Sequence, residues 1–597
     1  MAVKSYVMVC GGTGCVSSNA NEIYDQLHKE AELQGIADDV QIVKTGCFGF
    51  CEQGPIVKVL PNDHFYVQVK PEDAKEIIAE DILKGRAVER LVYKEDDMQE
   101  VTQNDGEEIK FYQKQLRIVL RNCGLINPEN INEYIARDGY HALEKALFEM
   151  SGDEIIEELK KSGLRGRGGA GFPTWMKWNF TKQTDNEVKY IACNADEGDP
   201  GAYMDRSVLE GDPHSVIEAM TIAGKCIGAA LGIVYIRAEY PLAIERLETA
   251  LGQARDMGLL GKDILGSGYD FDIELRLGAG AFVCGEETAL LQSVEGNRGM
   301  PMPKPPFPAV EGLFGKPTLI NNVETYANIP VIISKGGEWF AQFGTEKSKG
   351  TKVFALTGKV KNSGLVEVPM GSTLRDIIFD IGGGIRNGKK FKAVQTGGPS
   401  GGVITEEHLD MPIDFDNLLS IGSMMGSGGM IVMDEDDCIV DVARFYLEFS
   451  VEESCGKCSP CRIGTRKLLD YLDKIAQGKG TMEDLEHMER IGTHMHKAAL
   501  CMLGGSAANP ILSTLKAFRD EYVEHIKEGK CRAGKCKALV RYEIVPDKCI
   551  GCTLCARKCP VNCISGEKKA PHVIDQDACI KCGQCYESCK FDAIKIA

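Results

Sequence analysis

The chain has 597 residues, a hydrophobic content of 43% and a formal net charge of −18. This length predicts several domains of about 100–200 residues each, and the charge argues against nucleic acid or an anionic membrane surface as a partner. We find neither an apolar run long enough to span a membrane nor a signal-peptide pattern, so we expect a cytoplasmic protein. In that compartment the 24 cysteines are expected to be metal ligands rather than a disulfide framework.

Two cysteine pairs mark the first hundred residues, and each pair follows an expected strand. Four thiolates from two loops suit a [2Fe–2S] cluster, with a zinc site as the alternative. The expected ligands are Cys10, Cys15, Cys47 and Cys51. The pattern resembles a thioredoxin-like ferredoxin domain, which we place at 1–92. Residues 93–114 are acidic and rich in turn formers, so we expect a linker there.

A glycine-rich stretch, Gly163–Phe180, contains the pattern G-x-G-x-x-G at Gly166, Gly168 and Gly171. Glycine lets the backbone approach a phosphate or a flavin closely. A Rossmann fingerprint should follow a strand, whereas a helix is expected just before this stretch, at Asp153–Lys161. We therefore do not expect an ordinary Rossmann loop, and a flexible surface turn is the alternative.

Three further stretches belong with this loop: Lys189–Tyr203, Leu277–Leu291 and Lys316–Thr325. The first is expected to be a buried strand that runs into an acidic loop, and the second a strand, a glycine turn and a helix. Together with the glycine loop they resemble the flavin- and NADH-binding subunit of respiratory complex I and its soluble relatives in NAD-linked hydrogenases and formate dehydrogenases. The resemblance implies a Rossmann-like FMN- and NADH-binding domain, which we place at 115–345.

The resemblance also implies roles for individual residues. Lys177 would pair with the flavin phosphate, Lys304 would contact a pyrophosphate, and Glu197 and Glu287 would help to position the flavin. Three phenylalanines would contact the adenine and nicotinamide, with ordinary core packing as the alternative for each. The full set of expected cofactor-binding residues is Gly166, Arg167, Gly168, Gly171, Phe172, Lys177, Phe180, Asn194, Asp196, Glu197, Asp199, Phe282, Gly285, Glu286, Glu287, Lys304, Phe307, Asn321 and Asn322.

The expected chemistry needs no general base, because NADH donates a hydride to the flavin when their rings stack. The clustered carboxylates favour NAD over NADP, since like charges repel in a partly desolvated site. In relatives a tyrosine is common where this chain has Phe282, and a glutamate where it has Asp199. Both replacements keep shape or charge, so we expect them to tune the site rather than to abolish its function.

Residues 351–430 are expected to alternate strands with glycine turns, in the segments 352–360, 371–384 and 391–402. They resemble the ubiquitin-like β-grasp (SLBB-type) insert of the family, placed at 346–432, to which we assign no chemistry. Helices are expected at Cys438–Gln477 and Met482–Tyr522, within a helical bundle at 433–524. A [4Fe–4S] cluster needs a loop triplet of cysteines and one remote cysteine. The expected ligands are Cys455, Cys458, Cys461 and Cys501.

The tail, 541–597, contains two cysteine runs that repeat after thirty residues. It resembles a bacterial ferredoxin with two [4Fe–4S] clusters, in which the fourth cysteine of each run binds the other cluster. One expected set is Cys549, Cys552, Cys555 and Cys589, and the other is Cys579, Cys582, Cys585 and Cys559.

Four further residues are expected to form a zinc site around the linker 525–540, with free reduced thiols as the alternative. They are His525, Cys531, Cys536 and Cys563. The isolated cysteines are expected to be small buried hydrophobes, and these are Cys123, Cys193, Cys226, Cys284 and Cys438.

The sequence thus predicts an α/β multidomain chain that carries FMN, NAD(H), one [2Fe–2S] cluster, three [4Fe–4S] clusters and zinc. This fusion resembles the NAD-reactive subunit of electron-bifurcating [FeFe]-hydrogenases. The resemblance implies a hetero-oligomer with the hydrogenase catalytic subunit, a small thioredoxin-like [2Fe–2S] subunit and soluble ferredoxin. One alternative is the equivalent subunit of an NAD(P)-linked formate dehydrogenase or of a non-bifurcating NAD(P)-reducing hydrogenase. Another is an electron relay with an inactive nucleotide site.

Overall fold

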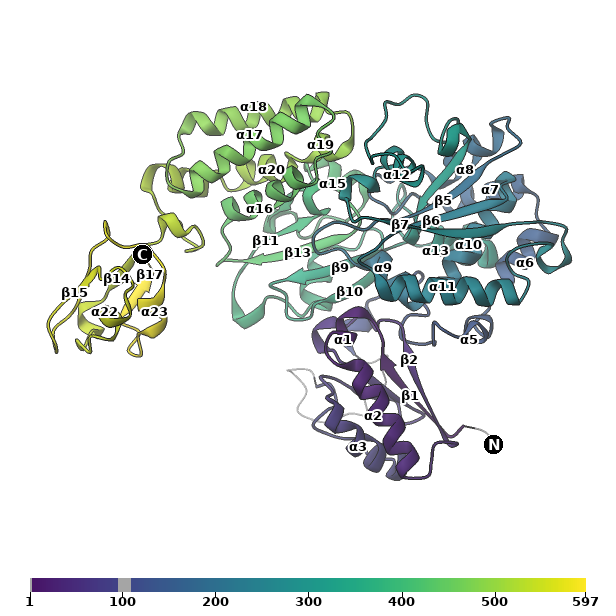
Figure 1. Cartoon of the computed structure of the whole chain (residues 1–597), viewed down its shortest axis with the longest axis horizontal. Helices are drawn as coiled ribbons and strands as arrows, with labels where there is room; N and C mark the ends of the chain where they lie inside the picture. The colour runs from purple at the N-terminus through teal and green to yellow at the C-terminus, as the bar shows by residue number, and fades with distance from the viewer. Residues whose placement is uncertain (1–2, 95–108, 597) are drawn as a thin grey trace. The chain divides into compact units, whose positions relative to one another are not determined.

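The computed structural model describes residues 3–94 and 109–596. The chain forms two compact units: Met1–Lys389 with Ala393–Val432, and Lys390–Lys392 with Met433–Ala597 (Figure 1). Most of the expected linker 93–114 lies outside the described residues, which omit 95–108. Among the described residues, no helix combines the length and apolar character that crossing a membrane requires.

The first unit begins with a four-stranded sheet of order β2-β1-β3-β4. Strand β1 pairs in parallel with β2 and antiparallel with β3. Because β1 and β2 are parallel, the loops after them leave the same edge of the sheet, and these loops carry the two cysteine pairs. The elements are β1 (Ser5–Cys10), α1 (Thr13–Val16), α2 (Ala20–Leu33), β2 (Val40–Thr45), β3 (Val57–Leu60), β4 (His64–Tyr66), α3 (Ala74–Glu76) and, within the last part of the expected linker, α4 (Lys110–Gln113).

The centre of the first unit is a four-stranded parallel sheet of order β7-β6-β5-β8. Helix α10 belongs to the core of this domain and is buried along almost its whole length. The strands are β5 (Tyr190–Ala195), β6 (Leu231–Arg237), β7 (Asp272–Gly278) and β8 (Thr318–Asn322). The helices are α5 (Ile131–Ile135), α6 (His141–Phe148), α7 (Gly152–Ser162), α8 (Thr174–Gln183), α9 (Met204–Gly211), α10 (Pro213–Ile227), α11 (Pro241–Asp256), α12 (Glu287–Val294), α13 (Val323–Lys335) and α14 (Gly337–Phe340).

As the sequence predicted, the glycine loop follows a helix rather than a strand, and it lies between α7 and α8. Helix α7 starts with a capping box in which Ser151 and Glu154 bond each other's backbone N–H groups. It ends at Gly163, whose φ of 63° is left-handed and costs glycine little. The chain therefore turns into the glycine loop at a position fixed by the end of α7.

A five-stranded sheet of order β10-β9-β13-β11-β12 follows. Its elements are β9 (Thr351–Gly358), β10 (Gly364–Pro369), β11 (Phe391–Thr396), β12 (Val403–Ile404), α15 (Phe415–Ser420) and β13 (Gly429–Asp434). The expected strand within 371–384 is wrong, because 374–381 is helical. Its buried residues Leu374, Ile377, Ile378 and Ile381 recur with the helical period that the sequence already contained. The β-grasp assignment stays a prediction.

The second unit contains the helices α16 (Ile439–Glu452), α17 (Ser459–Ala476), α18 (Met482–Ala498), α19 (Met502–Ser506), α20 (Asn509–Ala517) and α21 (Arg519–Val523). The two long helices expected here are each interrupted, and the interruptions at 453–458 and 499–501 hold cysteines. The tail then forms two short antiparallel strand pairs, β14 with β17 and β15 with β16. Its elements are β14 (Tyr542–Ile544), α22 (Leu554–Lys558), β15 (Ile564–Ser565), β16 (Val573–Ile574), α23 (Gln584–Ser588) and β17 (Ile594–Ile596).

Candidate functional site

The cysteines of the N-terminal domain lie together. Cys10 lies within hydrogen-bonding reach of Cys15 and Cys47, and the contact with Cys15 together with burial raises its pKa, although the contact with Cys47 acts to lower it. The Sγ atoms of Cys47 and Cys51 are 3.9 Å apart. A Cβ at Gly12 would lie 3.3 Å from the Cys47 sulfur, and one at Gly54 only 2.7 Å from the Cys15 sulfur. The glycines thus keep open the space between the thiols, and this donor set fits a [2Fe–2S] cluster.

The expected flavin residues gather at the carboxyl ends of parallel strands, where ligands bind in open α/β sheets. Asn194 lies in β5, and its side chain donates to the Gly285 carbonyl at 2.9 Å. Asn321 and Asn322 are the last two residues of β8, and Asn322 donates to the carboxylate of Asp205 and caps α13. The end of the sheet therefore holds the turn 282–285, the start of α9 and the start of α13 together.

Two lysines and two glutamates form an ion network beside this edge. Lys177 Nζ lies 3.0 Å from Glu287, and Lys304 Nζ lies 2.8 Å from both Glu286 and Glu287. Burial acts to raise the pKa of Glu287, but the two ammonium groups outweigh it and lower that pKa to about 2. Glu286 also accepts from the backbone N–H groups of Thr288 and Ala289 and so caps α12. Both lysines are bound by carboxylates, and their expected roles toward phosphate groups remain predictions.

Three phenylalanines of the predicted set are not core residues. Phe172, Phe180 and Phe307 are 43%, 45% and 56% exposed. Exposed aromatic rings around a glycine loop suit stacking against planar rings of a ligand. Phe282 instead packs beside Gly198, where an added Cβ would lie 2.9 Å from its ring.

The glycine loop packs closely against its neighbours. A Cβ at Gly168 would lie 3.1 Å from that of Asn322, and one at Gly171 would lie 2.7 Å from the Phe415 ring. Gly169 and Gly171 also have left-handed φ values of 119° and 64°. Glycine is therefore required here both for conformation and for close packing against Asn322 and Phe415.

Arg167 corrects the sequence prediction. Its side chain is fully buried and donates to the backbone carbonyls of Arg165, Lys349 and Thr351 at 2.6–3.0 Å. Burial lowers its pKa to about 10. The guanidinium thus fastens the glycine loop to the chain around β9, and the backbone N–H of Arg167 donates to the Thr325 hydroxyl at 2.8 Å.

The acidic loop after β5 holds carboxyl groups that are hard to ionise. Burial raises the pKa of Glu197 to about 7 and that of Asp199 to about 6. The carboxylate of Glu197 accepts from the backbone N–H groups of Asp205 and Arg206, both at 3.1 Å, at the start of α9. Ser427 donates to Asp199 at 2.6 Å, and Arg237 lies 3.9 Å from Asp196. Glu197 therefore positions α9 as well as the loop.

In the second unit, the interruptions of the helices bring four cysteines together. Cys458 directly precedes α17 and Cys501 directly precedes α19, where helix N-termini favour thiolates. Burial raises the pKa of Cys461 to about 11, and the charges of Cys455, Cys458 and Cys501 also act on it. A Cβ at Gly504 would lie 3.2 Å from the Cys461 sulfur. This arrangement fits the expected [4Fe–4S] ligand set.

The tail contains two pockets that match the two expected ligand sets. One is lined by Cys549, Cys552, Cys555 and Cys589, and the other by Cys559, Cys579, Cys582 and Cys585. His572 lines the first pocket and Tyr542 the second. Neither residue was expected from the sequence. Their spacing of thirty positions, which equals the spacing of the repeated cysteines, is the signal that could have found them.

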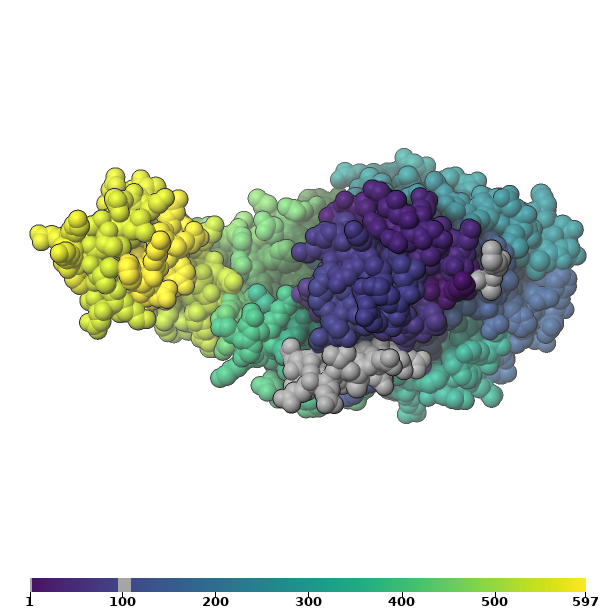
Figure 2. Space-filling view, turned by 90° about the horizontal axis from the view of Figure 1, so that it is seen from below, coloured from purple at the N-terminus to yellow at the C-terminus, as the bar shows by residue number. Residues whose placement is uncertain are grey.

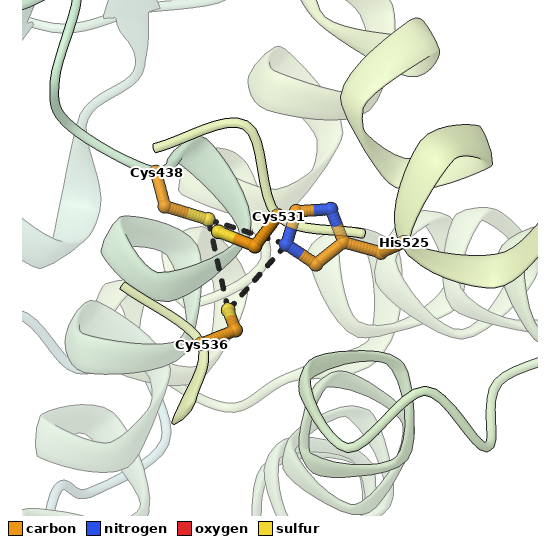
Figure 3. Close-up of side chains that lie close together, drawn as sticks. All are labelled: Cys438, His525, Cys531 and Cys536. Carbon is orange, nitrogen blue, oxygen red and sulfur yellow. Dashed lines mark hydrogen bonds between the residues drawn. The ribbon is translucent and has the colours of Figure 1, made fainter. Parts of the chain in front are cut away.

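The histidine and cysteine group differs from the prediction in one ligand (Figure 3). His525, Cys531 and Cys536 lie with Cys438, all four are buried, and their ligand atoms lie within 4.8 Å of one another. Cys563 instead lies in the tail, with its sulfur 3.4 Å from that of Cys559. The prediction that Cys438 is an isolated buried hydrophobe is therefore wrong. Cys438 lies directly before α16, and there it meets residues that are distant in sequence.

The nitrogen atoms of His525 have distinct partners. Nε2 lies 3.4 Å from the sulfurs of both Cys438 and Cys536, and Nδ1 bonds the Glu521 carbonyl at 2.7 Å. A carbonyl on the far nitrogen is the usual way to orient a metal-binding imidazole. The donor set of three thiols and one imidazole fits tetrahedral zinc.

Five family models match the chain, one of them twice. Residues 2–81 match the thioredoxin-like [2Fe–2S] ferredoxin, 159–331 the Nuo51 FMN-binding domain and 353–404 the SLBB domain. Residues 441–525 match the NADH-ubiquinone oxidoreductase-F iron–sulfur binding region, and 542–565 and 572–595 the 4Fe–4S binding domain. The flavin and iron–sulfur domains expected from the motifs are thus present.

Curated relatives cover the same regions. The chain is 60% identical over 481 residues to the NADP-reducing hydrogenase subunit HndC of Solidesulfovibrio fructosivorans, across 81% of this chain and 98% of that protein. It is 47% identical over 414 residues to an NADH-quinone oxidoreductase F-type subunit of Rhizobium meliloti, across 69% and 98% of the two chains. Among solved structures, a chain of an NAD+-reducing [NiFe]-hydrogenase in the H2-reduced state matches with a TM-score of 0.61 at 28% identity, across 88% and 85%.

Proposed function

The chain belongs to the family of flavin- and iron–sulfur-containing oxidoreductase subunits that includes HndC and the F-type subunits of NADH-quinone oxidoreductase, and we propose that it is the NAD(H)-reactive subunit of a hydrogenase. The observation that carries the proposal is the ion network of Lys177, Glu286, Glu287 and Lys304 beside a glycine loop and exposed phenylalanines. Charged groups and planar hydrophobic surfaces side by side suit a ligand that has both phosphates and aromatic rings.

The residues of the site bind and orient, and none has to transfer a proton. FMN held by these residues would supply the chemistry that takes a hydride from a nicotinamide and releases electrons singly. The backbone of the glycine loop would hold the phosphate end of the flavin, and Asn194 and Asn322 fix the neighbouring strand ends through their bonds to Gly285 and Asp205. Glu287 holds Lys177 and Lys304 near each other, so a phosphate that enters meets two positioned ammonium groups.

Nicotinamide preference is the first detail to test, because the relative HndC is named for NADP. The carboxylates of Asp196, Glu197 and Asp199 favour NAD, since a further phosphate near them would be repelled. We expect a higher kcat/KM for NADH than for NADPH with an artificial acceptor. A preference for NADPH would overturn the NAD assignment and leave the diaphorase function standing.

The partners proposed are an [FeFe]-hydrogenase catalytic subunit, a small thioredoxin-like [2Fe–2S] subunit and soluble ferredoxin, coupled by electron bifurcation. A ferredoxin-type tail in the same chain as the flavin domain supports this, because it offers a docking partner for a low-potential carrier. With the complete complex and hydrogen as donor, NAD reduction should require oxidised ferredoxin and ferredoxin reduction should require NAD. Full reduction of either acceptor alone would instead favour a simple NAD(P)-reducing hydrogenase. Activity with formate but not with hydrogen would favour the formate dehydrogenase alternative.

A second proposal concerns the metal centre, where Cys438, His525, Cys531 and Cys536 bind zinc. The support is geometric: four buried ligand atoms of the right types within 4.8 Å, and an imidazole oriented by a backbone carbonyl. The site is expected to be structural, because all four positions are filled by protein ligands.

Elemental analysis of purified variants tests this centre. Cys438→Ser should lose zinc and keep its iron, whereas Cys226→Ser, at a buried thiol that contacts the Gly152 carbonyl, should keep both metals. Retention of zinc in Cys438→Ser, or loss of zinc in Cys563→Ser, would show that the ligand set is wrong.

A further inference from the structure

Helix α9 contacts the thioredoxin-like domain at both of its ends. Near its C-terminal end, Glu210 accepts hydrogen bonds from the hydroxyl and, at 3.0 Å, from the backbone N–H of Thr13. Thr13 lies between Cys10 and Cys15 and begins α1, which faces this part of the flavin domain in Figure 1. Just before the N-terminal end of α9, the hydroxyl of Tyr203 lies 3.8 Å from the sulfur of Cys51 and donates to it. One helix therefore reaches the loops of both cysteine pairs.

The same helix is anchored in the candidate nucleotide site. Glu197 accepts from the first backbone N–H groups of α9, and Asp205 within α9 is bonded by Asn322 at the end of β8. The acidic loop and the ligand Cys51 are thus both held at the N-terminal end of this short helix, and the loop between Cys10 and Cys15 is held at its C-terminal end. A shift of α9 would alter both places.

Close packing holds this interface in register, and Figure 2 shows the thioredoxin-like domain lying against the rest of the first unit. A Cβ at Gly46 would lie 2.4 Å from the Cα of Gly211, so the two backbones touch. The Leu365 N–H donates to the carbonyl of Gly49 at 2.7 Å, inside the loop between Cys47 and Cys51. The contact between Tyr203 and Cys51 is therefore part of a fitted interface.

We propose that Tyr203 is a positioning residue for the N-terminal [2Fe–2S] cluster, whose hydroxyl donates a hydrogen bond to the ligand sulfur of Cys51 and raises the reduction potential of the cluster. The proposal rests on the ligand set given above. Reduction adds negative charge to the cluster, and a donor aimed at a ligand sulfur stabilises that charge. The positive charge of Arg206 also acts on Cys51, and its guanidinium lies 5.9 Å from the Tyr203 ring.

The bond makes this cluster easier to reduce from the nucleotide site. The acidic loop that leads from Glu197 to Tyr203 thereby tunes an electron acceptor as well as shaping the site. Sequence motifs did not identify this role, because Tyr203 and Cys51 are 152 positions apart.

The test compares Tyr203→Phe with Tyr112→Phe in the full chain, purified anaerobically with its clusters. Tyr112 is a matched control, because its hydroxyl donates to the Phe48 carbonyl at 3.0 Å, in the same cluster loop but not to a sulfur. The readouts are iron content and a redox titration of the [2Fe–2S] signal by electron paramagnetic resonance, at a temperature where [4Fe–4S] signals are broadened.

Tyr203→Phe should shift the midpoint potential to more negative values at unchanged iron content, and Tyr112→Phe should leave it unchanged. Equal potentials in Tyr203→Phe and the wild-type chain would overturn the proposal, and so would equal shifts in the two variants, which would indicate general loosening of the loop. A wild-type chain without any [2Fe–2S] signal would overturn the ligand set itself and this proposal with it.

Discussion

Glu197 is the residue whose ionisation most directly links the acidic loop to stability. Burial raises its pKa to about 7, from 4.5 for an ordinary glutamate. The folded chain therefore binds this proton more tightly than the unfolded chain does. Its stabilising contribution is complete below pH 4.5 and is lost as the pH rises through about 7.

Glu197→Gln should therefore flatten the dependence of stability on pH. We expect the unfolding midpoint of the wild-type chain to fall as the pH rises from 4.5 to about 7, the window between the unfolded and folded pKa values of Glu197, and that of the variant to fall less. Burial also raises the pKa of Asp199, to about 6, so both the wild-type chain and the variant keep part of the pH dependence of stability. Tryptophan fluorescence suits the measurement, because all three tryptophans, Trp175, Trp178 and Trp339, lie in the flavin domain. Identical slopes would contradict the assigned pKa.

Lys177 is the residue on which flavin binding should depend most clearly. Its ammonium contacts Glu287 and the Ile320 carbonyl, and its proposed partner is the flavin phosphate. Loss of a charge-assisted hydrogen bond costs about 1.5–3 kcal/mol, so Lys177→Met should weaken FMN binding by roughly 10- to 100-fold. Fluorimetric titration of the flavin-free chain measures this. Lys189→Met is the control, since that lysine donates to the Lys182 carbonyl instead, and equal loss in both variants would remove the special role of Lys177.

Among the elements, the repeated runs of the tail show how topology decides ligand sets. Each pocket takes three cysteines from one run and one from the other. Cys559→Ser and Cys579→Ser should therefore each cost the same cluster, about four iron atoms, and the double variant should lose no more than either single one. Combining Cys559→Ser with Cys549→Ser should cost about eight. If iron analysis showed that the iron losses of Cys559→Ser and Cys579→Ser add up in the double variant, the two cysteines would not bind the same cluster.

Local patterns predicted much of this architecture, and what they missed is long-range. The helix before the glycine loop, strands β1, β2 and β5 and the spacing of the cluster cysteines are encoded within short segments. The helix at 374–381 was readable from its apolar period but was hidden by the glycines around it. The partnership of Cys438 with His525 and the burial of Arg167 depend on tertiary packing, for which a single sequence has no local signal.

At the scale of the whole molecule, the chain joins a flavin domain to four cysteine sets that fit one [2Fe–2S] and three [4Fe–4S] clusters. The first unit holds the [2Fe–2S] ligands and the flavin site, and the second holds the other three sets. A flavin releases electrons singly, so several one-electron centres in the same chain are what a nicotinamide-reactive hub requires.

Anaerobic addition of NADH to the purified chain, loaded with FMN and its clusters, tests this central claim most directly. Flavin absorbance and cluster paramagnetic resonance are followed together, with dithionite as the reference for full reduction. We expect NADH to bleach the flavin and to reduce clusters in the wild-type chain, and the flavin-poor Lys177→Met variant to respond only in proportion to its remaining FMN. If FMN is bound and dithionite reduces the clusters, yet neither NADH nor NADPH reduces the flavin, the chain is not a nicotinamide-reactive subunit.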